Sequence, residues 1–228
     1  MPEVQPKEIQ RYVTSDGRVP FAEWFDSFKD TNTQAKIRSR LNRVVTGNLG
    51  DYRSVGEGVC ELRIDYGPGF RIYFGQVGTT IVLLLCGVKA LKTEISSKQK
   101  NTGQITTGFK TMAKSIPDHP FLIESLRKNP ALSAAYITAT IEEIDPEPEL
   151  LKLALGDVAE ALGQPKMTPE EYELHLKKLD ELLSLQGSDA IYNLGTWLNA
   201  LGLKLTVAVC TDTEDNTANA ETRSHLSV

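Results

Sequence analysis

Residues 59–74, VCELRIDYGPGFRIYF, decide the fold of the first half of the chain. Apolar side chains alternate with charged ones in VCELRID, and FRIYF alternates in a similar way, so each segment has the period of a strand. The YGPG between them is typical of a turn. The register that keeps both apolar sets on one face pairs Leu62 with Ile72 and places Arg63 opposite Arg71. The stretch therefore predicts an antiparallel hairpin with two arginines side by side.

The segments around this hairpin complete a small α+β unit. We expect a strand over 7–13 and a strand buried on both faces over 79–86, where TTIVLLLC is largely apolar. Between the first strand and the hairpin, apolar stripes at helical spacing predict one helix from Pro20 and another over 32–46. These elements predict a two-helix hairpin packed on a small antiparallel sheet. The aromatic residues expected in its core are Phe21, Trp24, Phe25 and Phe28.

The second half predicts a mostly α-helical domain. TPEE at 168–171 has the pattern of a capping box, with Thr168 as N-cap and Pro169 at the first helical position. Residues from Thr211 onward contain no apolar cluster, and we expect them to be disordered. The other expected elements are helices over about 131–143, 149–162, 169–185 and 189–201 and a closing strand over 202–209.

Composition argues against several classes of protein. The chain has 228 residues and a net charge of −5, and no apolar run is long enough to form a membrane-spanning helix. The N-terminus has no signal-peptide core, and the three cysteines show no metal-ligand spacing. We therefore expect a cytoplasmic protein that binds no metal, no other cofactor and no membrane.

The net charge hides a division between the halves. Residues 1–110 carry 16 basic and 11 acidic residues, whereas residues 111–228 carry 9 basic and 19 acidic residues. A basic half joined to an acidic half predicts complementary partners, and the basic half could also attract nucleic acid. Two ordinary domains of different isoelectric point would give the same division.

The opposed arginines are the first candidates for chemistry. Two guanidinium groups directly opposite each other on an antiparallel pair repel unless an anion lies between them. Arginine matches phosphate oxygens bidentately and stabilises charge that develops on phosphorus. Arg63 and Arg71 are therefore the predicted catalytic residues. The alternative is that both are solvent-facing strand residues, neutralised by Glu61 and Asp65.

Further basic residues follow one face of the helix expected over 32–46. Lys36, Arg40 and Arg43 are spaced at i, i+4 and i+7. They are candidates for an RNA-binding or ribosome-binding face, and a solvated helix face would show the same spacing. The first half contains no histidine, and His119 and His175 lie among charged or polar residues, so we expect both on the surface.

The first half resembles HigB-type addiction-module killer proteins of the RelE/ParE toxin superfamily. The segments YVTSDGRVPFAEWFDSFKD, GEGVCELRIDYGPGFRIYF and IVLLLCG carry this resemblance, which covers about residues 8–87. It implies a ribosome-dependent mRNA endonuclease (mRNA interferase) that uses no metal. In such enzymes the ribose 2′-hydroxyl attacks the neighbouring phosphate, which basic side chains bind. By this resemblance, Arg63 and Arg71 occupy the positions of the phosphate-binding arginines.

Residues 89–111 form a hydrophilic segment that departs from the toxin pattern. Toxins of this type usually end in a further helix and tail. One permitted choice of codons for residues 89–106, read in another frame, encodes SSQNRDIKQAKEYWADY, which resembles that ending. We interpret 89–111 as an out-of-frame remnant of the toxin C-terminus, joined to a second gene that began at Met112. An evolved hydrophilic linker is the alternative, and loss of the usual ending leaves open whether the toxin domain is active.

The second half resembles HigA-like addiction-module antidote proteins. AAYITATIEEIDPEPELLKLALGDVAEALG (134–163) is similar to their beginning, and LNALGLKLTV (198–207) is similar to their end. In place of the helix-turn-helix of such proteins, the chain has the acidic helix expected over 169–185, which suits a phosphate backbone poorly. The resemblance therefore favours toxin binding over DNA binding.

Together the two resemblances predict a type II toxin–antitoxin module in one chain. The expected parts are a toxin domain (1–88), the linker (89–111), an antitoxin-like domain (112–209) and a tail (210–228). The expected partners are its own antitoxin-like domain or a related antitoxin, and mRNA on the ribosome if the enzyme is active, with operator DNA as a weaker expectation. The alternatives are a non-enzymatic interaction protein with a toxin fold and an antitoxin-type transcriptional regulator.

Overall fold

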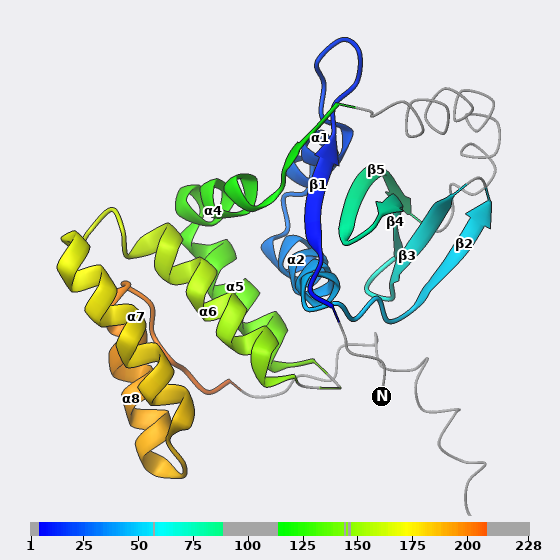
Figure 1. The fold of residues 1–228 in the computed structure, drawn as a ribbon. Coiled ribbons are helices and arrows are strands. Elements are labelled where there is room, and N and C mark those ends of the chain that lie inside the picture. The colour runs from blue at the N-terminus through cyan, green and yellow to red at the C-terminus, as the bar shows by residue number, and fades with distance from the viewer. Residues whose placement is uncertain (1–4, 57, 89–113, 144, 146, 209–228) are drawn as a thin grey trace, which may run out of the picture.

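The computed structural model describes residues 5–56, 58–88, 114–143, 145 and 147–208, and it contains a six-stranded sheet (Figure 1). The strand order is β2-β3-β4-β5-β1-β6. The strands are β1 (Glu8–Tyr12), β2 (Tyr52–Gly56), β3 (Val59–Ile64), β4 (Phe70–Val77), β5 (Thr80–Val88) and β6 (Ser115–Pro117). The helices are α1 (Pro20–Asp26), α2 (Thr31–Val45), α4 (His119–Lys128), α5 (Pro130–Ile141), α6 (Pro148–Leu162), α7 (Pro169–Ser184) and α8 (Ser188–Ala200).

The α+β class is confirmed, but the sheet is mixed rather than purely antiparallel. β1 pairs with β5 in parallel, and the other neighbouring strands are antiparallel. Parallel neighbours need a long connection between them. Here the chain provides it, because α1, α2 and three strands lie between β1 and β5 in the sequence.

The hairpin β3–β4 has the predicted register. Leu62 pairs with Ile72, and Arg63 pairs with Arg71. Gly67 and Gly69 in the connecting turn have φ angles of 52° and 74°, a backbone region that glycine enters without a Cβ clash.

Local sequence signals explain the bounds of the first two helices. Pro20 stands at the first position of α1, where its missing N–H is not needed. The Asp30 side chain caps α2 by accepting hydrogen bonds from the backbone N–H groups of Asn32 and Thr33. Both helices pack on the sheet, and Phe21 and Phe25 of α1 are fully buried, as predicted for this aromatic group.

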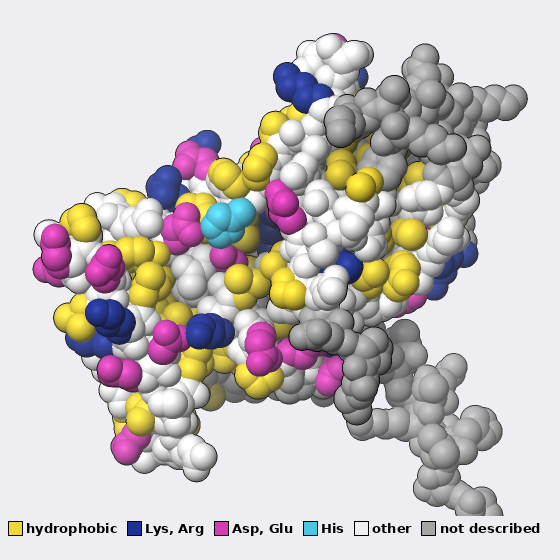
Figure 2. Space-filling model, in the orientation of Figure 1, with side chains coloured by type: hydrophobic (Ala, Val, Ile, Leu, Met, Phe, Trp, Pro, Cys, Tyr) yellow, Lys and Arg dark blue, Asp and Glu magenta, His cyan; other side chains and the backbone are white. Residues whose placement is uncertain are grey.

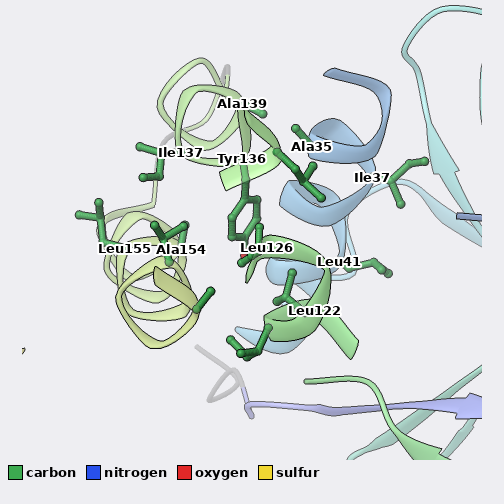
Figure 3. Packing of buried hydrophobic residues seen from close by; sticks show 14 of the residues in the cluster. Ala35, Ile37, Leu41, Leu122, Leu126, Tyr136, Ile137, Ala139, Ala154 and Leu155 are labelled. Atoms are coloured by element: carbon green, nitrogen blue, oxygen red, sulfur yellow. The ribbon is translucent and has the colours of Figure 1, made fainter. Parts of the chain in front are cut away.

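The second half packs directly on the first. β6 extends the sheet by pairing with β1, and α5 and α6 cover the side of α2 that faces away from the sheet (Figure 1). Figure 3 shows apolar side chains from four helices meeting in one cluster. The labelled members are Ala35, Ile37 and Leu41 of α2, Leu122 and Leu126 of α4, Tyr136, Ile137 and Ala139 of α5, and Ala154 and Leu155 of α6. One hydrophobic core therefore joins residues from both halves.

Helices α7 and α8 form a hairpin beyond α6 (Figure 1). The predicted capping box is present, because Thr168 Oγ1 accepts from the Glu171 backbone N–H and the Glu171 side chain accepts from the Thr168 N–H. The prediction that His175 lies on the surface is wrong. Its ring is buried and stacks on Trp197 with a centroid separation of 4.4 Å, because α8 covers that side of α7.

The closing strand predicted over 202–209 does not form within the described residues, which end at 208. The apolar side chains of this segment have no strand beside them, and Val207 is fully exposed. The predicted linker (89–111) and the predicted tail (210–228) lie outside the described residues, so their interpretation stays a prediction. Among the described residues, no helix combines the length and the apolar character that crossing a bilayer requires.

Candidate functional site

The predicted arginine pair lies on the face of the sheet opposite to α1 and α2. Side chains alternate along β3 and β4, so Arg63 and Arg71 share a face with Glu61 and Tyr73, whereas Leu62 and Ile72 face the helices. A second, smaller apolar cluster lies on the same face as the arginines. Its buried members are Val59, Tyr73, Val82 and Leu84. The site is thus a polar group set beside apolar side chains on one face of the sheet.

Glu61 is the centre of this polar group. Its side chain is 2% exposed, and its Oε1 lies 3.0 Å from Arg53 Nε, 3.3 Å from Arg63 Nε and 3.8 Å from Arg71 Nε. The other carboxylate oxygen accepts a 3.0 Å hydrogen bond from the Tyr73 hydroxyl. The structure therefore brings the two predicted arginines together and adds Arg53, which the sequence analysis did not identify.

These contacts shift the ionisation of the central groups. Burial opposes the charge on Glu61, but the hydrogen bonds from Tyr73 and Arg63 and the charge of Arg53 outweigh it and lower the pKa of Glu61. Burial, together with the hydrogen bond to Glu61, raises the pKa of Tyr73 to about 12. At neutral pH the group therefore holds an ionised carboxylate and a neutral phenol.

The remaining charges leave the arginines only partly neutralised. Asp51 lies 3.5 Å from Arg63 and Asp65 lies 3.7 Å from Arg71, but both carboxylates are more than half exposed and are screened by water. Arg71 is 7% exposed, its Nη1 donates to the Phe70 carbonyl at 2.8 Å, and its Nε has no hydrogen-bond acceptor. Three guanidinium groups therefore surround a single buried carboxylate, whose negative charge offsets their mutual repulsion.

The predicted RNA-binding residues of α2 all contact other parts of the chain. Lys36 pairs with Glu142 at 3.3 Å. Arg43 pairs with three acidic residues of the segment between α5 and α6, at 3.5, 3.4 and 3.2 Å. Those residues are Glu143, Asp145 and Glu147, respectively. A role for Lys36 and Arg43 in RNA binding stays a prediction. In this structure both side chains form ion pairs with acidic residues of the second half.

Arg40 connects α2 to the arginine site. Its Nε donates to the Arg63 carbonyl at 3.3 Å, and its Nη2 donates to the carbonyls of Leu49 and Asp51. Burial is the main cause that lowers the pKa of Arg40 to about 10, with the charge of Arg43 as a further cause. Arg40 therefore orders the backbone of β3 and the loop before β2, and its own binding to RNA stays a prediction.

A buried polar contact between the halves was not predicted. Arg38 of α2 is 1% exposed, and its Nη1 lies 2.6 Å from Asp118, which directly precedes α4. The Asp118 carboxylate also lies 3.3 Å from Arg11 Nε on β1. Arg38 belongs to the helix expected over 32–46 and directly follows Ile37 of its apolar stripe. A charged residue next to that stripe is the one sequence signal that could have indicated a buried ion pair.

The described residues contain no group of three or more His, Cys, Asp or Glu side chains that could hold a metal ion. The predicted surface position of His119 is confirmed, since its side chain is 55% exposed and its Nε2 lies 3.0 Å from Glu160.

Comparison with known proteins gives one relative and no function. The chain is 43% identical over 67 residues to an uncharacterized protein of Haemophilus influenzae, a match that covers 29% of this chain and 68% of that protein. No family model matches the chain. No solved structure matches it either.

Proposed function

We propose that this chain, which belongs to the same family as the Haemophilus influenzae protein, is a type II toxin–antitoxin module in a single polypeptide. The first half would be a RelE/HigB-like toxin domain of the ribosome-dependent mRNA endonuclease class, and the second half an antitoxin-like domain that restrains it. One observation carries the proposal. The acidic segment that follows α5 pairs with Lys36 and Arg43, two of the residues predicted to face RNA or the ribosome.

The proposed restraint acts through α2 and leaves the arginine site on the opposite face of the sheet. α5 and α6 cover α2 (Figure 1), while Arg63 and Arg71 lie on the face of the sheet opposite to α1 and α2. Opposite charges across this contact favour docking. Covalent linkage adds a high effective concentration, so the docked state is favoured even where each contact is weak.

The proposed chemistry relies on the arginines as phosphate ligands. Glu61 holds Arg63 and Arg71 side by side, and the Arg63 side chain is 30% exposed. Preorganised guanidinium groups stabilise charge that develops on a phosphate in the transition state. In the proposed step the ribose 2′-oxygen of the RNA loses its proton and attacks the adjacent phosphorus. The bond from phosphorus to the 5′-oxygen breaks, and that oxygen takes up a proton, so the products are a 2′,3′-cyclic phosphate and a 5′-hydroxyl end. The resemblance to metal-independent toxins implies that this step uses no metal.

The proposal is tested by weakening the contact in the full chain. Glu143→Lys with Glu147→Lys places two positive charges beside Arg43, which reverses the attraction in this part of the contact. Purified variants are added to a reconstituted translation system, and cleavage of the translated mRNA is measured. We expect cleavage by the double variant, none by the original chain, and none when Arg71→Ala is added to the double variant.

The matched control is Glu173→Lys, since Glu173 is exposed on α7 and faces no part of α2. It should leave the chain inactive. Hydrogen exchange of the α2 amides verifies that the contact has opened. Opening of α2 without mRNA cleavage would exclude the restrained enzyme.

The second candidate is an interaction protein whose toxin fold has no activity. The observation that favours it is the position of Glu61, whose carboxylate already occupies the centre of the three guanidinium groups. This candidate predicts that the opened double variant binds a related antitoxin but cleaves no mRNA.

A DNA-binding regulator has less support. Figure 2 shows Lys and Arg side chains interspersed with Asp and Glu over the visible face of the second half, without a continuous basic patch. Acidic residues also dominate the first turn of α7. A phosphate backbone requires an excess of positive charge.

A further inference from the structure

A cavity lies where the two halves meet. Its volume is about 520 Å³, within the range of small-molecule sites. The first half contributes β1 and α2 to its wall, and the second half contributes the start of α4 and one side of α6. The exposed surface of the lining is mostly apolar, with Ile9, Leu41, Leu122 and Leu153 among its residues, although eight of the fifteen lining residues are polar or charged.

Asp157 of α6 is a buried carboxylate in this wall. It is 4% exposed, and its Oδ2 accepts a 2.9 Å hydrogen bond from the neutral Tyr136 hydroxyl. The nearest basic group is His119, whose Nδ1 lies 3.7 Å from Asp157 Oδ1. No lysine or arginine of the described residues pairs with Asp157. Burial is the main cause that raises the pKa of Asp157 to about 6.

The other charged groups of the wall are already paired or lie at its rim. Arg38 binds Asp118, so its charge is compensated within the wall. Lys7 directly precedes β1 and is half-buried, and Glu8, the first residue of β1, is exposed. A buried carboxylate whose nearest basic group is the exposed His119, at 3.7 Å, is stabilised by a ligand that brings a further positive charge.

We propose that this cavity binds a small organic amine, with its ammonium group against Asp157 and its apolar body along Ile9, Leu41 and Leu153. The ligand would contact residues of both halves at once, so its binding would stabilise the docked arrangement. The proposal does not depend on the activity of the arginine site, because it rests on the cavity and on Asp157 alone.

Calorimetric titration of the full chain with hexylamine, hexanol and hexanoate tests the proposal. The three probes share one apolar body and differ in the charge of the head group. We expect hexylamine to bind at least about tenfold more tightly than hexanol, which corresponds to about 1.4 kcal/mol, and hexanoate to bind least. Equal affinities for hexylamine and hexanol, or no binding of hexylamine, would overturn the proposal.

Two variants and one control locate the site. Asp157→Asn keeps the shape of the side chain and should remove the preference for hexylamine over hexanol. Leu153→Phe keeps the carboxylate and fills part of the cavity, and it should weaken hexylamine and hexanol alike. Glu160→Gln removes a nearby acidic group that does not line the cavity, and it should leave the preference intact. Hexylamine binding that survives both cavity variants unchanged would show that it binds elsewhere.

Discussion

Removal of the Asp118 carboxylate should destabilise the whole chain. Asp118→Asn removes the carboxylate that pairs with Arg38, which is 1% exposed, and with Arg11. Removing one partner of a buried ion pair costs about 3–5 kcal/mol. The Arg38 guanidinium lies over the Phe25 ring, 4.4 Å from the centroid, but this contact is common to the original chain and the variant and does not change the difference between them. The expected loss is therefore about 3–5 kcal/mol.

The measurement is urea denaturation of the full chain at neutral pH, followed by circular dichroism. The control is Asp180→Asn, because Asp180 lies 2.6 Å from Lys152, the same separation as in the Arg38–Asp118 pair, but both side chains are more than half exposed. An exposed pair contributes at most about 1 kcal/mol. Arg11→Met and Arg38→Met combined with Asp118→Leu should recover most of the loss, since the triple variant leaves neither arginine without its counter-charge. If Asp118→Asn and Asp180→Asn lower the free energy of unfolding equally, the argument from burial is refuted.

Three further predictions concern other parts of the chain. Burial raises the pKa of Asp157 to about 6, so the folded state binds a proton more tightly than the unfolded state. The free energy of unfolding should therefore fall as pH rises from 4 to 6. Denaturation at several pH values should show this slope in the original chain, and Asp157→Asn should lose it. Tyr73→Phe removes the hydroxyl that donates to Glu61 and should cost about 1 kcal/mol in denaturation, and no loss would contradict a hydrogen bond at that position. Thr168→Ala removes the N-cap of α7 and should cost about 1 kcal/mol, with faster amide exchange in the first turn of α7 and an unchanged rate in α2.

The sequence predicts those elements whose signal is local. The alternation in β3 and β4 identifies both strands and their register, because a shift by one residue would turn the apolar side chains away from the core. β2 was not predicted, since it is an edge strand whose residues are largely exposed and show no alternation. β6 has only three residues, too few to show a pattern. α4 has ten residues and buries Leu122, Ile123 and Leu126, so its apolar spacing was a signal that the prediction missed.

The arginine site likewise contains contacts that the sequence predicts and contacts that it does not. The register places Arg63 opposite Arg71, and this pair was predicted from the sequence alone. The contact of Arg53 with Glu61 depends on β2 pairing with β3, so it could not be predicted without that strand. The partners of Lys36 and Arg43 come from a segment about a hundred residues later, and no local pattern determines such a contact.

The position of Asp118 also affects the chain while it is being synthesised. Arg38 precedes Asp118 by 80 residues. At about 5–20 residues per second, a ribosome needs roughly 4–16 s to travel that far. During this interval the emerging first half lacks the counter-charge of Arg38 and the strand that pairs with the free side of β1. The first half therefore completes its folding only after the segment that covers α2 has begun to leave the ribosome. The order of synthesis itself keeps the first half from reaching its final state alone.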